Sequence, residues 1–110
     1  MTIDNFTINN SDINYIGSEL VRPECALADK DGSLWISDGR GGVTRLFADG
    51  SQEFIQQSMN AEKLVGSLPN GLALLEDGSF AIANMGTRRL ERMSVSGDTT
   101  VLCDNIDGLP

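Results

Sequence analysis

The chain has 110 residues, of which 16 are aspartate or glutamate and 8 are lysine or arginine, so its formal net charge is −8. That charge argues against a nucleic-acid or acidic-membrane partner, because both need basic surface. Histidine is absent, which excludes Ser-His-Asp and Cys-His catalysis and histidine-ligated zinc. Any chemistry must therefore use carboxylates, amides, hydroxyls, lysine or a metal held by oxygen atoms.

The N-terminal part of the chain is polar, and we expect it to contain no secretory signal. Residues 1–12 lack the basic start and apolar core of a secretory signal, and we expect them to be loosely attached. Nowhere does the chain have the roughly 18 consecutive apolar residues of a membrane-spanning helix. We therefore expect a cytoplasmic protein with no membrane partner. Residues 13–16 alternate Ile-Asn-Tyr-Ile, which predicts a short strand.

A first group of four strands is predicted between about residues 23 and 55. It begins with Cys25–Ala28, a continuous apolar run typical of a strand buried on both faces. The other strands are predicted at residues 34–36, 43–47 and 52–55. Turns rich in aspartate and glycine separate them, at residues 30–32, 38–42 and 49–50.

A second group of four strands is predicted between about residues 69 and 103, at residues 72–75, 80–83, 89–95 and 99–103. A longer connection over residues 56–68 leads to it, in which Asn60–Val65 has the pattern of one helical turn. Residues 104–110 resemble the approach to a third group. The two cysteines, Cys25 and Cys103, have no spacing motif and are expected to be buried free thiols.

The beginnings of the two groups repeat one pattern at a constant offset of 46 residues. Residues 23–38 read PECALADKDGSLWISD and residues 69–84 read PNGLALLEDGSFAIAN. The overlay sets Glu24 against Asn70 and Asp38 against Asn84. A period of this length with strand–Asp-Gly–strand in each unit is typical of β-propeller blades, which run about 40–45 residues. The fold prediction is all-β, with two four-stranded antiparallel blades.

An incomplete propeller is the expected domain organisation, with residues 13–110 forming two blades and a tail that leads to a missing third. A blade covers its faces by packing on its two neighbours, so two blades leave two faces open. We expect a fragment that is inactive and partly unfolded or aggregated on its own. The alternative is a small self-contained β domain with a repeated hairpin pattern.

The chain resembles the senescence-marker-protein/gluconolactonase/luciferin-regenerating-enzyme-like family over about residues 13–110. The similar stretches are Arg22-Pro23-Glu24 before CALADKDGSLWISD, Gly41-Gly42-Val43-Thr44-Arg45-Leu46, and Leu68-Pro69-Asn70-Gly71-Leu72-Ala73-Leu74 before EDGSFAIAN. The resemblance implies a closed, six-bladed propeller that hydrolyses lactones with a calcium-type metal. This chain would be its first two blades.

The resemblance also implies a metal site. Glu24 matches the family glutamate that ligates the metal at the start of the first inner strand, and Asn70 matches a Pro-Asn position facing the same channel. The family pattern continues Gly-Pro with an aromatic residue, whereas Glu24 is followed by Cys25-Ala26-Leu27. The remaining family ligands lie in later blades. The opposing interpretations are a solvated turn carboxylate for Glu24 and a turn residue for Asn70.

The function that the resemblance implies is that of a metal-dependent lactone hydrolase acting on a small sugar-type or related lactone, with Ca²⁺ as the expected cofactor. Glu24 is also the candidate catalytic carboxylate. The alternatives are a non-catalytic propeller scaffold and a strictosidine-synthase-like propeller enzyme.

Among the remaining polar residues, Asp38 and Asn84 are expected to cap turns, and Arg88, Arg89 and Arg92 to form a solvated face. Trp35 and Phe80, at near-equivalent strand positions, are expected to pack between blades.

Overall fold

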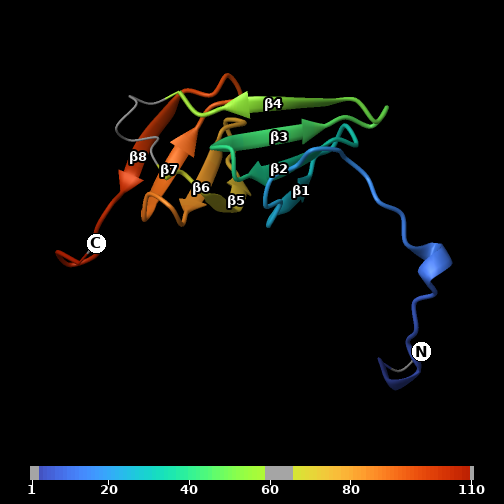
Figure 1. The fold of residues 1–110 in the computed structure, drawn as a ribbon. Coiled ribbons are helices and arrows are strands. Elements are labelled where there is room, and N and C mark those ends of the chain that lie inside the picture. Colours follow the sequence, from blue (N-terminus) through green and yellow to red (C-terminus); the bar gives the residue numbers. More distant parts are fainter. Residues whose placement is uncertain (1–2, 59–65, 110) are drawn as a thin grey trace.

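Two four-stranded antiparallel sheets make up the fold in the computed structural model, which describes residues 3–58 and 66–109 (Figure 1). The first sheet has the strand order β1-β2-β3-β4, formed by Ala26–Ala28, Leu34–Asp38, Gly42–Leu46 and Gln52–Gln56. The second has the order β5-β6-β7-β8, formed by Pro69–Leu74, Phe80–Asn84, Arg89–Met93 and Thr99–Cys103. Each strand pairs with the next one along the chain, as hairpin turns require.

The predicted all-β character and the two four-stranded units are confirmed, two local predictions differ from the structure, and a third falls on residues that the structure does not describe. Ile13–Ile16 forms no strand, because no neighbouring strand pairs with it. Cys25–Ala28 is not buried on both faces: Ala26 and Ala28 are exposed, while Cys25 and Leu27 are half-buried. The predicted helical turn at Asn60–Val65 lies outside the described residues.

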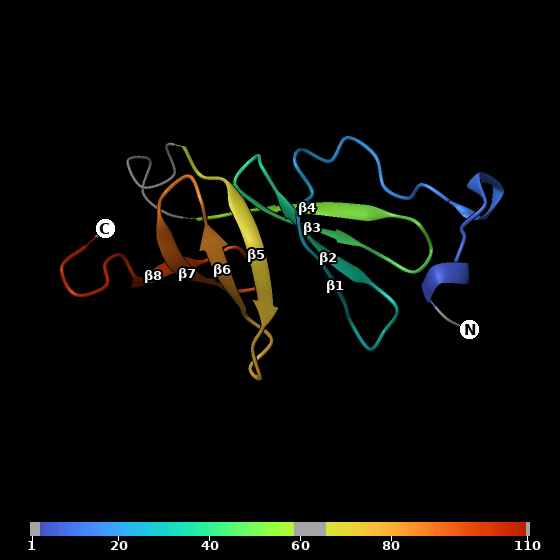
Figure 2. The same cartoon turned by 90° about the horizontal axis from the view of Figure 1, so that it is seen from below.

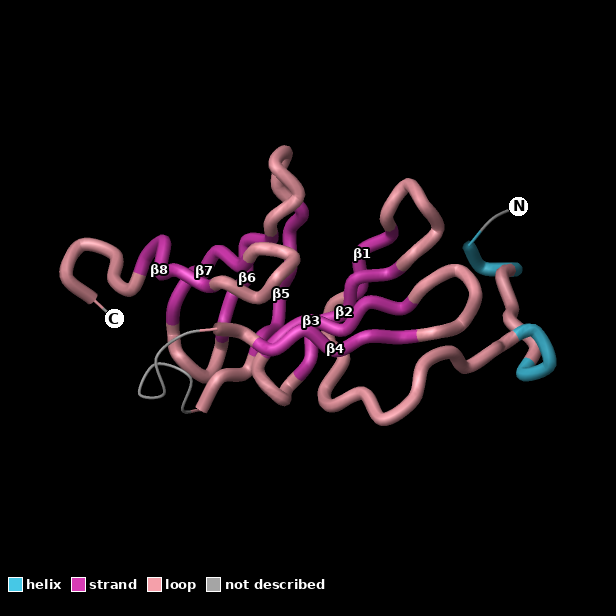
Figure 3. Tube along the Cα trace, turned by 90° about the horizontal axis from the view of Figure 1, so that it is seen from above, coloured by secondary structure: helices cyan, strands magenta, loops and turns pink. Residues whose placement is uncertain are grey.

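The only helices in the described part of the chain are two short 3-10 turns near the N-terminus, η1 (Ile3–Asn5) and η2 (Asn10–Asp12). They extend away from the sheets (Figure 3). Neither helix among the described residues is long and apolar enough to span a membrane.

The Asp-Gly-Ser turns show why both sheets have the same local structure. In the first sheet Asp31 Oδ1 accepts a hydrogen bond from the Ser33 backbone N–H at 2.9 Å, and in the second Asp77 Oδ1 accepts one from Ser79 at 3.0 Å. The intervening glycines, Gly32 and Gly78, have φ of +85° and +84°, which residues with a side chain rarely adopt. The sequence repeat is therefore also a repeat of turn geometry.

One arginine on β3 and one on β7 make the same contacts with the Asp-Gly-Ser turn of their own sheet. Arg45 donates from Nε to Ser33 Oγ at 3.3 Å and forms an ion pair with Asp31. Arg92 donates from Nε to Ser79 Oγ at 3.0 Å and forms an ion pair with Asp77. Arg92 is exposed, as expected, and it is also tied to the turn of its own sheet.

An apolar seam joins the two sheets and forms the core. Trp35 and Val43 of the first sheet pack with Leu72, Phe80, Ile82 and Met93 of the second, and half-buried Cys25, Leu27 and Ile55 border them. The inner strands β1 and β5 lie side by side at this seam (Figure 2). Phe80, Ile82 and Met93 are fully buried, so the seam is where most apolar burial occurs.

Trp35 and Phe80 are in direct contact across this seam, which confirms their predicted packing. Their ring centroids lie 4.9 Å apart at an interplanar angle of 62°, an edge-to-face arrangement. In the repeat, Phe80 is equivalent to Leu34 and Trp35 to Ala81. Successive strand residues point to opposite faces. The seam therefore pairs one face of the first sheet with the opposite face of the second.

The two outward faces of this pair of sheets differ in their cover. The chain before β1 lies across the first sheet, where Ser18 exchanges hydrogen bonds with the Gln52 side chain and Gly39 N–H donates to Val21 O at 2.6 Å. Ile36 and Leu46 beneath it are buried. We call the face of the first sheet that carries Trp35 the Trp35 face. The equivalent face of the second sheet carries three exposed residues, Ala73, Ala83 and Leu90. No described segment covers that face.

The seam predicts a large stability effect at Phe80. Phe80→Ala is expected to lower the free energy of unfolding by about 3–5 kcal/mol, because it removes a fully buried ring and leaves a cavity. Phe6→Ala is the matched control: Phe6 is 56% exposed, and its loss is expected to change stability by less than about 0.5 kcal/mol. Urea unfolding of both variants measures the difference. Equal effects would show that the seam is not the core.

Candidate functional site

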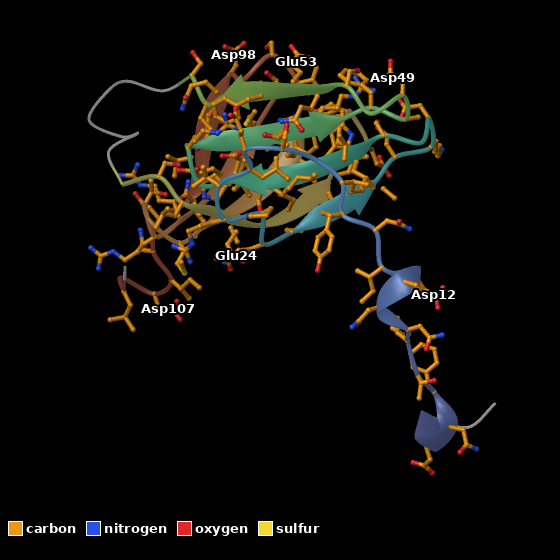
Figure 4. All side chains as sticks on the ribbon, turned by 45° about the vertical axis from the view of Figure 1, so that its right-hand side comes forward. Asp12, Glu24, Asp49, Glu53, Asp98 and Asp107 are labelled. Carbon is orange, nitrogen blue, oxygen red and sulfur yellow. The ribbon has the colours of Figure 1, made fainter. Side chains whose placement is uncertain are left out.

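Glu24 and Asn70 meet where the two inner strands begin. Glu24 directly precedes Cys25 and β1, and Asn70 is the second residue of β5. Asn70 Nδ2 donates a hydrogen bond to Glu24 Oε2 at 2.7 Å. Glu24 lies on the opposite side of the sheets from Glu53 (Figure 4). The predicted convergence of these two side chains is therefore present, and their role as metal ligands stays a prediction.

Arg22 is the third member of this cluster, and the sequence reasoning did not single it out. Its Nη2 and Nε donate to Glu24 Oε1 at 2.6 and 3.1 Å. Arg22 has a φ of +47°, a left-handed conformation that costs a residue with a side chain about 1–2 kcal/mol. Such strain, when it persists at a cleft or cluster, is a sign of a functional or tightly determined position. Arg22-Pro23-Glu24 in the sequence was the available signal.

The oxygen atoms of Glu24 and Asn70 are of the kind that a hard divalent cation prefers, but they are too few to complete its coordination. Glu24 has a carboxylate that is 39% exposed, and Asn70 has an amide oxygen. In the structure Asn70 directs its amide nitrogen at Glu24, so ligation through Oδ1 requires the amide to turn. Ca²⁺ takes about 6–8 oxygen ligands. The part of the chain that the structure describes contains no group of three or more acidic or cysteine side chains placed to hold a metal.

An open groove of about 910 Å³ adjoins the cluster at Asn70 and runs along the exposed face of the second sheet to the C-terminal tail. Its walls are mainly apolar, formed by residues that include Ala83, Met85, Leu90, Ile106 and Leu109.

The two arginines at this groove differ in exposure. Arg88 is exposed and has a φ of +56°. It directly precedes β7, as Gly41, with a φ of +98°, directly precedes β3. Arg89 is only half-buried overall, yet its Nη1 is buried without a hydrogen-bond partner among the described residues. The prediction that Arg89 lies on a solvated face is therefore wrong.

Asp38 ends β2 as a fully buried carboxylate and caps the following turn, as expected. It accepts hydrogen bonds from the Arg40 backbone N–H at 3.0 Å, from Arg40 Nη2 at 2.7 Å and from Thr44 Oγ1 at 2.9 Å. Burial alone would raise the pKa of Asp38. The hydrogen bonds from Arg40 and Thr44 and the Arg40 charge outweigh burial, so the pKa of Asp38 lies below its ordinary value.

Asn84, the equivalent residue of the second sheet, also caps its turn. Its Oδ1 accepts hydrogen bonds from the backbone N–H groups of Gly86 and Thr87, both at 3.1 Å. Its Nδ2 contacts Glu91, a buried carboxylate on β7 that the sequence reasoning missed. The signal for Glu91 was weak, because its repeat equivalent is the uncharged Thr44.

The cysteines are both free, as predicted, but they are not both buried. Cys25 is half-buried at the seam, where its Sγ lies 3.4 Å from the Leu72 backbone nitrogen. Cys103 is exposed at the end of β8, next to the open groove. Its predicted burial is wrong because no described segment packs on that end of the second sheet.

Comparison of the chain with protein-family models, curated proteins and solved structures found no match.

The Asp38 contacts predict an acid-sensitive contribution to stability. The pKa of Asp38 is lower in the folded protein than in the unfolded chain, where it is about 3.9. Its stabilising contribution is therefore present above that value and is lost as the pH falls through the lower folded pKa. Asp38→Asn is expected to cost about 1.5–3 kcal/mol at neutral pH. The difference from the unmodified protein should shrink steadily below about pH 4.

Urea unfolding between pH 7 and pH 2 measures this dependence. The control is Asp12→Asn, which makes the same chemical change at an exposed residue of η2. A difference between Asp38→Asn and the unmodified protein that stays constant across this pH range would contradict the assignment.

Proposed function

We propose that the two sheets are successive blades of a β-propeller and that Glu24 belongs to the metal site of a lactone hydrolase. The observation that carries the proposal is the 2.7 Å contact between Glu24 and Asn70, which occupy the same position of successive repeats. In a propeller, equivalent residues at the start of the inner strands face a common axis. The resemblance of the Pro-Glu and Pro-Asn stretches to lactone hydrolases supplies the reaction class.

The arrangement of the sheets supports stacking in one direction. The Trp35 face of the first sheet packs on the second, and the equivalent face of the second sheet is open, with Leu90 42% exposed. A third sheet of the same kind would cover this face and fill the groove beside Asn70. Its equivalent of Asn70 would then reach the same axis and add a ligand.

Glu24 and Asn70 have distinct parts in the proposed site. When bound, a calcium ion there would supply Lewis-acid polarisation of the lactone carbonyl. Glu24 would hold the ion through its carboxylate, and Asn70 through Oδ1 after its amide turns. Arg22 holds Glu24 Oε1 in the structure and would compete with the ion for that oxygen. A carboxylate, of which Glu24 is one candidate, would accept a proton from the attacking water.

The hydrogen bonds of Glu24 also favour a second function, that of a non-catalytic propeller scaffold. Both carboxylate oxygens are already engaged, Oε1 by Arg22 and Oε2 by Asn70. In a scaffold this cluster would serve only to fasten the edges of two blades. The two functions differ in whether a cation displaces these contacts.

Glu24→Gln separates the two, because it keeps the size of the side chain and removes its charge. With the further blades present, the lactonase proposal expects calcium affinity to fall at least tenfold and lactone turnover to fall by about 10²–10⁴. The fold should be retained. Calorimetric calcium titration and hydrolysis assays on a panel of sugar and alkyl lactones are the measurements.

Glu53→Gln is the matched control, since Glu53 is an exposed carboxylate on β4 far from the cluster (Figure 4). It should leave calcium binding and turnover unchanged. A protein that binds no calcium and hydrolyses no lactone, and in which Glu24→Gln changes only stability, would be a scaffold.

A further inference from the structure

Four buried polar side chains form a closed ring of hydrogen bonds behind Asn70. Asn84 Nδ2 donates to Ser67 Oγ at 2.8 Å, and Ser67 Oγ donates to Gln57 Oε1 at 2.7 Å. Gln57 Nε2 and Asn84 Nδ2 each donate to Glu91 Oε1 at 2.8 Å. All four residues are less than one-tenth exposed. We call this set of residues the Asn84 ring.

The Asn84 ring is attached directly to the backbone that leads into Asn70. Asn84 Oδ1 accepts a hydrogen bond from the Leu68 N–H at 3.0 Å, and Met85 N–H donates to Leu68 O at 3.0 Å. Pro69 is paired with Asn84 across the sheet. The backbone N–H and C=O of Leu68, two residues before Asn70, are therefore both hydrogen-bonded to residues at the end of β6.

Asn70 itself lies in an irregularity of the sheet. The register between β5 and β6 shifts between Pro69 and Gly71, so Asn70 has no partner on β6. A bulge of this kind leaves one residue unpaired and redirects its side chain. The direction of Asn70 thus depends on how the bulge is anchored, and the anchor on its N-terminal side is Asn84.

Glu91 sets the orientation of Asn84. Glu91 is fully buried and accepts hydrogen bonds from Gln57, Asn84 and, at 2.9 Å, Thr87 Oγ1. It has no ion-pair partner in the described part of the chain. Because Glu91 Oε1 accepts the hydrogen bond, it selects the amide nitrogen of Asn84 as the donor. The amide oxygen is then turned toward the backbone N–H groups of Leu68, Gly86 and Thr87.

The first sheet has no such ring, so this hydrogen-bonded anchor serves Asn70 and has no counterpart at Glu24. At the equivalent position Asp38 is satisfied by Arg40 and Thr44. Its side chain has no hydrogen bond to the residues that lead into Glu24. Glu24 is held instead by the nearby Arg22.

We propose that Asn84, oriented by Glu91, is a positioning residue that anchors the bulge and thereby aims Asn70 at Glu24. The relevance of this positioning to catalysis rests on the proposed function. The positioning itself rests on the hydrogen bonds and the bulge alone.

The test is made on the folded protein by nuclear magnetic resonance of the Asn70 side-chain amide. As a single substitution, Glu24→Gln should shift the Asn70 resonance, because it changes the acceptor of the Asn70 N–H. Asn84→Asp places a second carboxylate oxygen against Glu91. It should move the Asn70 resonance to that of an exposed amide and abolish its response to Glu24→Gln.

Glu91→Gln is a milder second variant, because it keeps the shape of the ring. A glutamine both donates and accepts, so it no longer selects the Asn84 nitrogen. The Leu68 N–H should exchange with solvent faster, and the Asn70 resonance should lose part of its response to Glu24→Gln. Combining Asn84→Asp with Glu91→Gln restores one carboxylate facing one amide and should recover the response.

Asp77→Asn is the matched control, since Asp77 caps the opposite end of the β5–β6 hairpin. It should lower stability without moving the Asn70 resonance. The proposal is overturned if folded Glu91→Gln leaves Leu68 exchange and Asn70 unchanged, or if the double variant does not recover the response.

None of these measurements uses a metal or a lactone, so the positioning can hold even if the lactonase proposal fails. Calcium titration of the Asn84→Asp and double variants then tests the link between the two. Loss and recovery of affinity in step with the Asn70 resonance would support both proposals. Unchanged calcium affinity with a displaced Asn70 would exclude Asn70 as a ligand and leave its positioning by Asn84 intact.

Discussion

Burial of Trp35 against Phe80 is the interaction on which the rest of the structure depends. A four-stranded sheet cannot bury an apolar face alone, so each sheet needs the other. The contact joins opposite faces of two equivalent sheets. It therefore sets the two inner strands side by side, with the same end of each at the same edge. Glu24 and Asn70 meet as a consequence, although 46 residues separate them.

Buried polar groups at the strand ends complement this apolar seam. Asp38 and Glu91 are both fully buried carboxylates, and they are satisfied in different ways. Asp38 has the guanidinium of Arg40 beside it, whereas Glu91 has three neutral donors from side chains. A buried carboxylate left without such partners would be costly, so these networks tolerate few alternative arrangements. They give the ends of the strands a unique geometry that apolar packing alone would not provide.

The cluster around Glu24 is sparse, and its surroundings explain why. Within the described residues one carboxylate, one amide and one guanidinium converge there. The next position of the repeat would lie over the open face of the second sheet, beside the groove at Asn70. In the proposed propeller, a further blade would both cover this face and add a side chain to the cluster.

The sequence by itself determined the local structure. Asp-Gly-Ser turns and alternating strands depend on neighbouring residues, so the eight strands, their order within each unit and the equivalence of Glu24 and Asn70 were all predictable. Only the tertiary structure decided which faces meet and what the polar groups contact. A period-two pattern specifies that residues alternate, and it does not specify which sheet covers which face. The Asn84 ring joins β6 and β7 to the connection after β4, and Gln57 reaches Glu91 across 34 residues of sequence. No local pattern encodes such contacts, because they exist only once the seam has packed.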